Sequence, residues 1–426
     1  MDPFESLLEN FHKVPVEERV LRVASWCGLH AQDLDVLSGR DSLSLGTAEH
    51  LIENVVGIFP LPLGIATYFN IDGRDVLIPM AVEESSIIAA ISSTARWIRR
   101  NKGTIRTEAR GRRIIGQIQI PRSKNPAASV QLLNDARDRL IAEANNMLPN
   151  LCARGGGIDA IEVRQLERAD HGGEMLVIHF LCNPCDAMGA NIINQVCEGM
   201  KPAIEALTGE KVGLCILSNL VDGNLAFAEV RIDSVDDETA YGIEEATEFA
   251  KTDPYRATTH NKGVLNGIDP ILIATGNDWR AVESGIHAYA ARSGKYQPVT
   301  EWKREGKTLV GRFEAPIAVG TVGGVTSLHP TSKIAMKILG VQHADELARI
   351  CAAAGLVQNL GALKALATVG IVKGHMRLHA ANLAMAAGAT REEMPLLRER
   401  LTQLLNRERR INLTMAKEVL SEIRGN

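Results

Sequence analysis

Apolar residues recur at helical spacing near the start of the chain and again over its last part. Between residues 87 and 98 they repeat every three or four positions, and Ser85 and Ser86 before them can cap a helix. The Asn-Lys-Gly sequence at 101–103 is a typical end for that helix. Further helices are expected over residues 5–29, 37–51 and nearly all of 344–426.

The pattern changes to strand-like alternation after Gly111. Strands are expected over residues 114–120, 158–166, 175–181 and 212–220, with helices over 130–148 and 187–207. This β-α-β-β-α-β order is the split βαβ pattern, an antiparallel sheet with helices on one face. We therefore expect an α+β fold, in which a small ferredoxin-like domain (111–222) is inserted into a large, mainly helical domain (1–110 and 223–373). Residues 374–426 form a separate helical segment at the end.

Other segments carry less regular patterns. Residues 54–79 form an extended stretch broken by prolines, and a strand is expected over 226–232. The polar run 253–270 has little periodicity and is expected to be a loop, of the kind that often forms sites. The apolar run 268–273 is expected to be a strand, and the glycine-rich run 319–326 a turn that admits a ligand.

Composition places the chain among ordinary globular proteins. Its 426 residues are 45% hydrophobic and 23% charged, and the net charge of -4 argues against a dedicated nucleic-acid binder. The acidic, amphipathic first twenty residues lack the pattern of a signal peptide. No apolar run approaches the ~18 residues that a membrane span needs. We therefore expect a cytoplasmic protein with no membrane partner.

The cysteines and histidines do not predict a metal site. Seven scattered cysteines are no disulfide framework, and the pair Cys182 and Cys185 lacks the two further ligands of a zinc site. Reduced, buried thiols are favoured over a redox pair. His375 and His379 share a helix face, but Met376 stands where a metalloprotease would have glutamate, and no third ligand is evident. We expect no metal, and we interpret His375 as an acid or base.

Two glycine-containing segments are candidates for binding a nucleotide. Residues 155–157 with Ala160 match G-x-G-x-x-A by letter, but they lie between a helix and a strand, so we interpret them as a flexible connector. Residues 186–191, Asp-Ala-Met-Gly-Ala-Asn, lie where a predicted helix begins, and such a helix start lets backbone N–H groups approach a pyrophosphate. A plain helix cap by Asp186 explains the same letters equally well.

The polar run 253–270 offers groups for an anionic substrate. Arg256 could hold a carboxylate through two parallel hydrogen bonds, and Lys262, beside a glycine, could stand close to a substrate. A solvated loop is the alternative. Asp278 lies at the start of a predicted helix, where it could hold a lysine in place or simply cap the helix.

Together these segments resemble the class II 3-hydroxy-3-methylglutaryl-coenzyme A (HMG-CoA) reductases, the soluble bacterial and archaeal form, over nearly the whole chain. The matching blocks are Glu53-Asn-Val-Val-Gly, residues 72–79, Val82-Glu-Glu-Ser-Ser, 186–191, 253–270, 276–283, Gly323-Gly324 and Gly374-His-Met. The resemblance implies an enzyme that interconverts HMG-CoA and mevalonate plus coenzyme A by two hydride transfers. It also implies a nicotinamide cofactor and a flap formed by the C-terminal helices 374–426.

The resemblance further implies roles for individual residues. Lys262 would stabilise the oxyanion, and Asp278 would hold Lys262 in place. Glu84, protonated because of burial, would donate a proton, and His375 would protonate the departing CoA thiolate. The HMG part would be bound by Ser86, Arg256 and Asn266. The cofactor would be bound by Asp186, Met188, Gly189, Ala190, Asn191 and Asn219. The family pattern has proline where this chain has Ser85, a change that a helix start tolerates.

The resemblance leaves the cofactor as NADPH or NADH, with NADPH favoured. Members of the family that use NAD can carry an Asp a few residues before the glycine connector, whereas this chain has Leu148 there and Arg154 nearby. The family also implies at least a homodimer, with sites built across the subunit interface. Both directions of the reaction stay open.

Two other functions remain as alternatives. Another CoA-linked NAD(P)-dependent oxidoreductase, such as an acylating aldehyde dehydrogenase, would need a nucleophilic cysteine, and no cysteine lies in a site-like block. A non-enzymatic nucleic-acid binder would use the basic run from Arg96 to Arg113, which holds eight Lys or Arg and one Glu. That run lacks interleaved aromatic residues, and a solvated face is its favoured interpretation.

Overall fold

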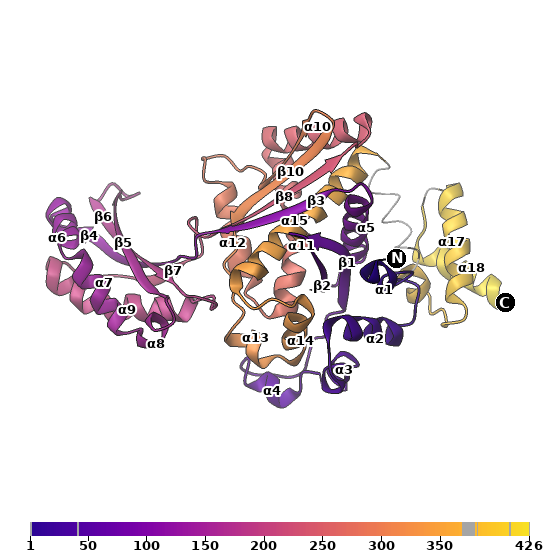
Figure 1. Ribbon diagram of the computed structural model, residues 1–426, viewed down its shortest axis with the longest axis horizontal. Coiled ribbons are helices and arrows are strands. Elements are labelled where there is room, and N and C mark those ends of the chain that lie inside the picture. The colour runs from indigo at the N-terminus through magenta and orange to yellow at the C-terminus, as the bar shows by residue number, and fades with distance from the viewer. Residues whose placement is uncertain (1, 41, 369–379, 381, 409, 426) are drawn as a thin grey trace.

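The computed structural model describes residues 2–40, 42–368, 380, 382–408 and 410–425, and it forms three bodies in a row. Figure 1 shows a small domain at one end, joined by two chain passages to a central large domain. The C-terminal helices lie at the other end. The prediction of an α+β fold is confirmed, because each of the first two bodies has its own sheet and its own helices.

The small domain is built on a four-stranded antiparallel sheet in the order β5-β6-β4-β7. Its strands are β4 (Ile114–Ser123), β5 (Gly157–Glu167), β6 (Glu174–Asn183) and β7 (Cys215–Ser218). Its helices are α6 (Pro126–Asp135), α7 (Arg137–Asn146), α8 (Pro149–Cys152) and α9 (Ala190–Thr208). The split βαβ order is therefore present. The single helix expected over 130–148 is instead two, because the backbone at Ala136 (φ -92°, ψ 3°) departs from helical geometry.

The large domain contains a six-stranded sheet, of which the hydrophobic pattern predicted the strand over 226–232 but not the sheet as a whole. Its order is β2-β1-β3-β8-β10-β9; β1 and β3 run parallel, and the other neighbours run antiparallel. The strands are β1 (Leu63–Ile71), β2 (Arg74–Ala81), β3 (Thr104–Arg110), β8 (Leu225–Asp233), β9 (Thr300–Glu305) and β10 (Thr308–Pro316). Strand β3 lies within the basic run. The sequence pattern did not predict it because Ile105 is its one buried side chain and most of its other residues are polar or charged.

Helix α15 (Ala344–Ala367) is the centre of the large domain. It packs on strands β3, β8 and β10 and on the helices α5 (Ile87–Arg100), α10 (Asp237–Thr252) and α11 (Pro254–Thr275). Among the described helices it alone is long and apolar enough to cross a membrane, but 67% of its most apolar window is buried inside the protein. Its apolar character is therefore explained by its place in the core.

Helix α11 shows that two expectations were wrong. The loop expected over 253–270 and the strand expected over 268–273 are one helix of 22 residues. Asp253 caps it by accepting hydrogen bonds from the backbone of Tyr255 and Arg256, and Pro254 suits its first position. Gly276, with φ of 70°, ends it. The polar residues of its outer face had hidden the helical spacing of its buried residues.

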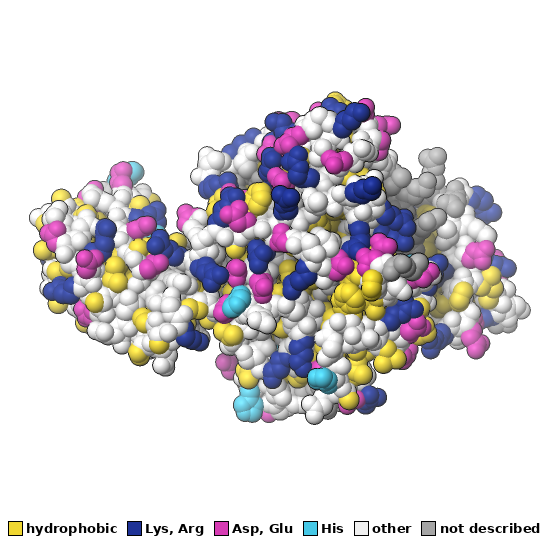
Figure 2. Space-filling view, viewed as in Figure 1, with side chains coloured by type: hydrophobic (Ala, Val, Ile, Leu, Met, Phe, Trp, Pro, Cys, Tyr) yellow, Lys and Arg dark blue, Asp and Glu magenta, His cyan; other side chains and the backbone are white. Residues whose placement is uncertain are grey.

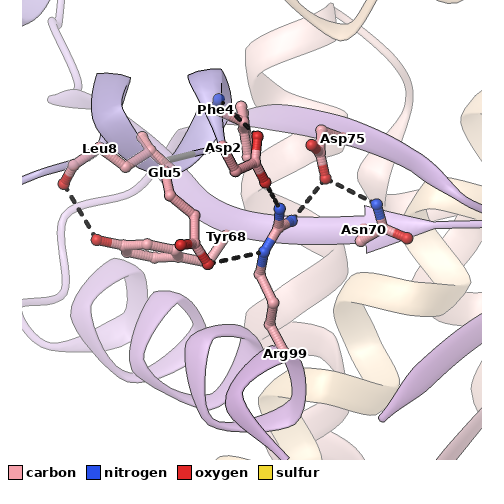
Figure 3. A network of polar contacts seen from close by, with 8 residues as sticks. All are labelled: Asp2, Phe4, Glu5, Leu8, Tyr68, Asn70, Asp75 and Arg99. Atoms are coloured by element: carbon pink, nitrogen blue, oxygen red, sulfur yellow. Dashed lines mark hydrogen bonds and ion pairs between the residues drawn. The ribbon is translucent and has the colours of Figure 1, made fainter. Parts of the chain in front are cut away.

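The helix expected over 5–29 is also broken in two. Its parts are α1 (Pro3–Leu7) and α2 (Val16–Cys27), and they are followed by α3 (Ala31–Leu37) and α4 (Leu45–Glu49). Arg99 of α5 holds α1 against the large domain, because its guanidinium pairs with the carboxylates of Asp2, Glu5 and Asp75 (Figure 3). The remaining elements are α12 (Trp279–Ala290), α13 (Gly324–Leu328), α14 (Pro330–Leu339), α17 (Met394–Glu408) and α18 (Leu413–Arg424).

The two chain passages between the domains touch each other. Gly111 has φ of 76°, and a Cβ atom there would lie 1.9 Å from the carbonyl oxygen of Gly223, so this position admits only glycine. Directly beside this contact, Arg110 and Leu225 are register partners at the end of the β3–β8 pairing. The inserted domain therefore leaves and rejoins the large sheet at one point.

Candidate active site

Lys262 and Glu84 lie side by side in the large domain, although 178 positions separate them in the sequence. Glu84 is in the turn between β2 and α5, and Lys262 Nζ donates to its Oε2 at 3.3 Å. Their side chains are 60% and 41% exposed. A ligand can therefore reach both groups from solvent, but the burial expected around Glu84 is absent from this single chain.

Helix α11 presents Lys262 and Asn266 on one face, because residues four apart lie one above the other. Arg256, in the first turn of the same helix, is half-buried, and burial lowers the pKa of its guanidinium. None of the ion pairs among the described residues involves Arg256. A half-buried cation without a counter-charge suits an anionic ligand.

Ser86 opens α5 in an unusual backbone conformation. It occupies the N-cap position with φ of 82°, in the left-handed region, and its side chain makes no capping hydrogen bond. The expected helix start is therefore right, but the expected side-chain cap is wrong. Non-glycine residues rarely adopt this conformation, and such strain gathers at functional sites.

Asp278 caps α12 and points its carboxylate at its own helix. Its Oδ1 accepts hydrogen bonds from the backbone N–H of Ala281 at 3.1 Å and from Arg280 Nε at 3.4 Å. The helix cap weighed as an alternative is thus present, at a junction of two helices rather than of a strand and a helix. Within the described ranges no ion pair joins Asp278 to Lys262.

Asp186 lies where the two domains meet. Its Oδ1 accepts a hydrogen bond from the backbone N–H of Ala344 at 3.0 Å, and its Oδ2 lies 3.3 Å from Nδ1 of His343. Asp186 therefore caps α15, and the idea that it caps the helix following it in sequence is wrong. That helix, α9, has Gly189 with φ of 87° at its N-cap, so it begins at Ala190 and later than expected.

A pocket of about 300 Å³ brings four of the six candidate cofactor residues together with Asp278. Residues 187–192 line it, together with Asp278 and residues of the glycine-rich run 319–326. Asn219 lines a smaller neighbouring pocket with Met188 and Ala190. The N-terminal end of α9 thus faces a cavity whose walls include several glycines, an arrangement that suits a phosphate group.

Asn277 joins two walls of this pocket, and the sequence analysis gave it no role. Its Nδ2 donates to the carbonyl oxygen of Gly320 at 3.2 Å, and its Oδ1 accepts from the N–H of Gly320 at 2.8 Å. A Cβ atom at Gly320 would lie only 2.6 Å from the backbone nitrogen of Met188. Asn277 therefore holds the glycine-rich run at Gly320, and the N–H of Thr321 joins that run to the carbonyl oxygen of Asp186 at 2.9 Å. Its place beside Asp278 in the 276–283 block was the available signal.

Half of the basic residues in the run 96–113 form ion pairs. Besides Arg99, three of its arginines form ion pairs: Arg110 with Glu108 and Glu314, Arg112 with Asp345, and Arg113 with Asp159. Figure 2 shows basic and acidic side chains interspersed over this face of the large domain. These pairings favour a solvated face over a nucleic-acid stripe.

His375 and His379 lie outside the described residues. The seven cysteines are free, and burial raises the pKa of both Cys182 and Cys197 to about 12, so these two groups are thiols rather than reactive thiolates. In the ranges that the structure describes, no group of three or more His, Cys, Asp or Glu could hold a metal ion.

Comparison with known sequences gives the same picture over most of the chain. The family model described as hydroxymethylglutaryl-coenzyme A reductase matches residues 15–380. The 3-hydroxy-3-methylglutaryl-coenzyme A reductase of Archaeoglobus fulgidus is 47% identical over 425 residues, which cover 99% of this chain and 95% of the relative. A probable 3-hydroxy-3-methylglutaryl-coenzyme A reductase of Borreliella burgdorferi is 32% identical and covers 89% of this chain, with 87% of its own length matched.

Solved structures agree with this similarity. The 3-hydroxy-3-methylglutaryl-coenzyme A reductase of Streptococcus pneumoniae superposes with a TM-score of 0.82 and 36% identity over 97% of this chain and 99% of its own. A structure of the class II reductase from the same organism, bound to NADPH in open conformations, has a TM-score of 0.81 and 36% identity. It covers 84% of this chain and 99% of its own.

Proposed function

Because the chain belongs to the hydroxymethylglutaryl-coenzyme A reductase family, we propose that it interconverts HMG-CoA and mevalonate plus coenzyme A by two hydride transfers. The observation that carries this proposal is the contact of Lys262 with Glu84, together with a half-buried Arg256 on the same helix as Lys262 that forms no ion pair among the described residues. A carbonyl that gains negative charge needs a fixed cation, and the carboxylate of an acyl substrate needs a second one.

Within this proposal the protein residues bind, orient and move protons. Lys262 stabilises the negative oxygen that forms at each reduction, and Glu84 donates a proton to it. Asp278 turns from its cap towards Lys262 when substrate is bound and orients it. His375 protonates the CoA thiolate. Ser86, Arg256 and Asn266 hold the HMG part.

The cofactor proposed is a nicotinamide dinucleotide, which supplies the hydride when bound. Residues 186–191 and Asn219 would hold it, and the pocket at the N-terminal end of α9 fits a pyrophosphate because its glycines allow close backbone approach. We favour NADPH over NADH, since Leu148 offers no acceptor for a ribose hydroxyl and Arg154 is exposed beside the connector. The match to an NADPH-bound reductase supports this choice.

We also propose a homodimer, cytoplasmic, with the site closed across the interface. The segment 52–59 carries Val56 fully exposed and Phe59 88% exposed. Apolar side chains this open are typical of a surface that a partner covers. Covering would also supply the burial that Glu84 lacks. The division into 1–110, 111–222, 223–373 and a flap 374–426 is part of the same proposal.

The test is absorbance at 340 nm with HMG-CoA and either NADPH or NADH, for the wild type and Lys262→Ala. We expect two reduced cofactors to be consumed per HMG-CoA by the wild type and none by the variant. If neither cofactor is consumed, and mevalonate with coenzyme A and oxidised cofactor gives no reverse signal, the reductase proposal fails. Loss of activity after thiol alkylation would favour the CoA-linked oxidoreductase with a nucleophilic cysteine.

A further inference from the structure

A buried polar cluster lies in the core behind Lys262. It consists of five residues that we call the α11 anchor: His260 and Asn261 of α11, Thr300 and Trp302 of β9, and Asn359 of α15. Each is at most 3% exposed. Buried polar groups destabilise a protein unless they are hydrogen-bonded, so a connected cluster of five in the core requires an explanation.

Hydrogen bonds connect the three elements of the α11 anchor. Trp302 Nε1 donates to Asn359 Oδ1 at 2.9 Å, which leaves the Asn359 amide nitrogen 3.2 Å from His260 Nε2. His260 Nε2 is thus the ring nitrogen that bonds within the anchor, whereas the buried Nδ1 has no hydrogen-bond partner among the described residues. Thr300 Oγ1 donates to Asn359 Oδ1 at 3.0 Å and lies 2.5 Å from His260 Nε2.

Asn261 ties the same turn of α11 to the chain that enters β9. Its Nδ2 donates to the carbonyl oxygen of Gln297 at 2.9 Å, and its Oδ1 accepts from the N–H of Val299 at 3.0 Å. Both ends of the Asn261 amide are therefore used. Consecutive anchor residues of α11 thus bond to two different elements, β9 with its preceding segment and α15.

The anchor residues of α11 are immediate neighbours of the proposed site residues. Successive helix residues are turned by about 100°, so His260 and Asn261 point into the core while Lys262 points outward. Arg256 lies one turn before His260, and burial together with Arg256 lowers the pKa of His260 to about 3. A neutral ring therefore adds no charge beside the Arg256 guanidinium.

We propose that the α11 anchor is a positioning device that fixes the rotation of α11, so that Lys262 and Arg256 face the substrate. The inference rests on the proposed function of these two residues. Directed hydrogen bonds oppose a small rotation of the helix, whereas apolar contacts tolerate it. Correct orientation matters because a displacement of about 1 Å can lower a rate by about a hundredfold.

The experiment compares His260→Leu with His260→Gln. Glutamine keeps a hydrogen-bonding group near the place of Nε2, and leucine does not. We expect His260→Leu to lower kcat/KM for HMG-CoA by about a hundredfold, and His260→Gln to restore most of that loss. The Kd of NADPH, measured by fluorescence titration, should stay unchanged in both, because the residues proposed to hold it lie on other elements.

Thr247→Val is the matched control, since Thr247 is 1% exposed and bonds to the carbonyl oxygen of Ile243 in α10, outside the anchor. It should lower the melting temperature without lowering kcat/KM at 25 °C. If His260→Leu does not fold, Thr300→Val replaces it with the same expected direction. If the anchor variant has the kcat/KM of the wild type while Lys262→Ala is inactive, the proposed positioning role of the anchor is wrong and the reductase proposal stands. Full activity of Lys262→Ala overturns the proposed function instead.

Discussion

The carboxylate of Asp186 caps a helix that begins 158 residues later, by accepting the backbone N–H of Ala344 at 3.0 Å. The small domain thus contributes the cap of the central helix of the large domain. Asp186→Ala leaves the first turn of α15 without this acceptor and should lower the free energy of unfolding by about 1 kcal/mol. Urea denaturation measures the change. Asp186→Asn keeps an oxygen acceptor and should lose less, and equal losses in the two variants would contradict the cap.

The carboxyl group of Asp269 should make the protein less stable at alkaline pH. Burial, and then Glu283 beside it, raise the pKa of Asp269 to about 8 from an ordinary value of 3.8. Between a pH of 3.8 and a pH of about 8, the folded state therefore holds this proton while the unfolded state releases it. The free energy of unfolding falls as the pH rises through this interval and is constant above it.

Asp269→Asn mimics the protonated carboxyl group and removes this pH dependence. Urea denaturation at pH 8.5 should show the variant to be more stable than the wild type, with the advantage shrinking towards pH 4. An advantage that is the same at both pH values would mean that the Asp269 proton is not responsible.

Phe59→Glu should convert the proposed dimer into a monomer, because it places a charge in the exposed apolar segment 52–59. Sedimentation velocity measures the change, and reductase activity should fall with it. Leu214→Glu, at a 67% exposed position on the small domain, is the control and should leave the dimer intact. A wild-type protein that sediments as a monomer would refute the proposed interface.

Gly320→Ala should weaken cofactor binding by tenfold or more, roughly the effect of 1.4 kcal/mol. The added methyl group meets the backbone nitrogen of Met188 at 2.6 Å, and backbone atoms cannot rotate aside as a side chain can. Fluorescence titration with NADPH gives the Kd. Gly46→Ala, where the nearest atom would be 4.0 Å away, should bind like the wild type.

The small domain was predictable from the sequence because its strands alternate and its helices are amphipathic over short distances. The sheet of the large domain was not, since β3 has one buried residue and pairs with β8 across the whole inserted domain. The prediction for α11 was wrong for a related reason. Its polar face carries Lys262 and Asn266. Polar residues at such positions leave fewer apolar residues at helical spacing, so the periodicity that would predict a helix is weak.

The residues of the candidate site were found through the resemblance, and their geometry was not accessible to sequence reasoning. The contact between Glu84 and Lys262 depends on how β2 and α5 pack on α11. His260 and Asn359 carried no signal, because a buried histidine and a buried asparagine look like any polar residue of a helix. The positioning role proposed for them follows only from their hydrogen bonds in the folded core.

The crossing of the chain at Gly111 and Gly223 has a consequence for the order of folding. Arg110 and Leu225 would be joined by a simple hairpin if the residues between them were removed. In the unfolded chain these residues form a long loop, whose closure costs entropy before β3 and β8 can pair. Once the small domain has folded, its two ends lie together and the loop is effectively short. We therefore expect the inserted domain to fold first and so to bring β3 and β8 of the large sheet together.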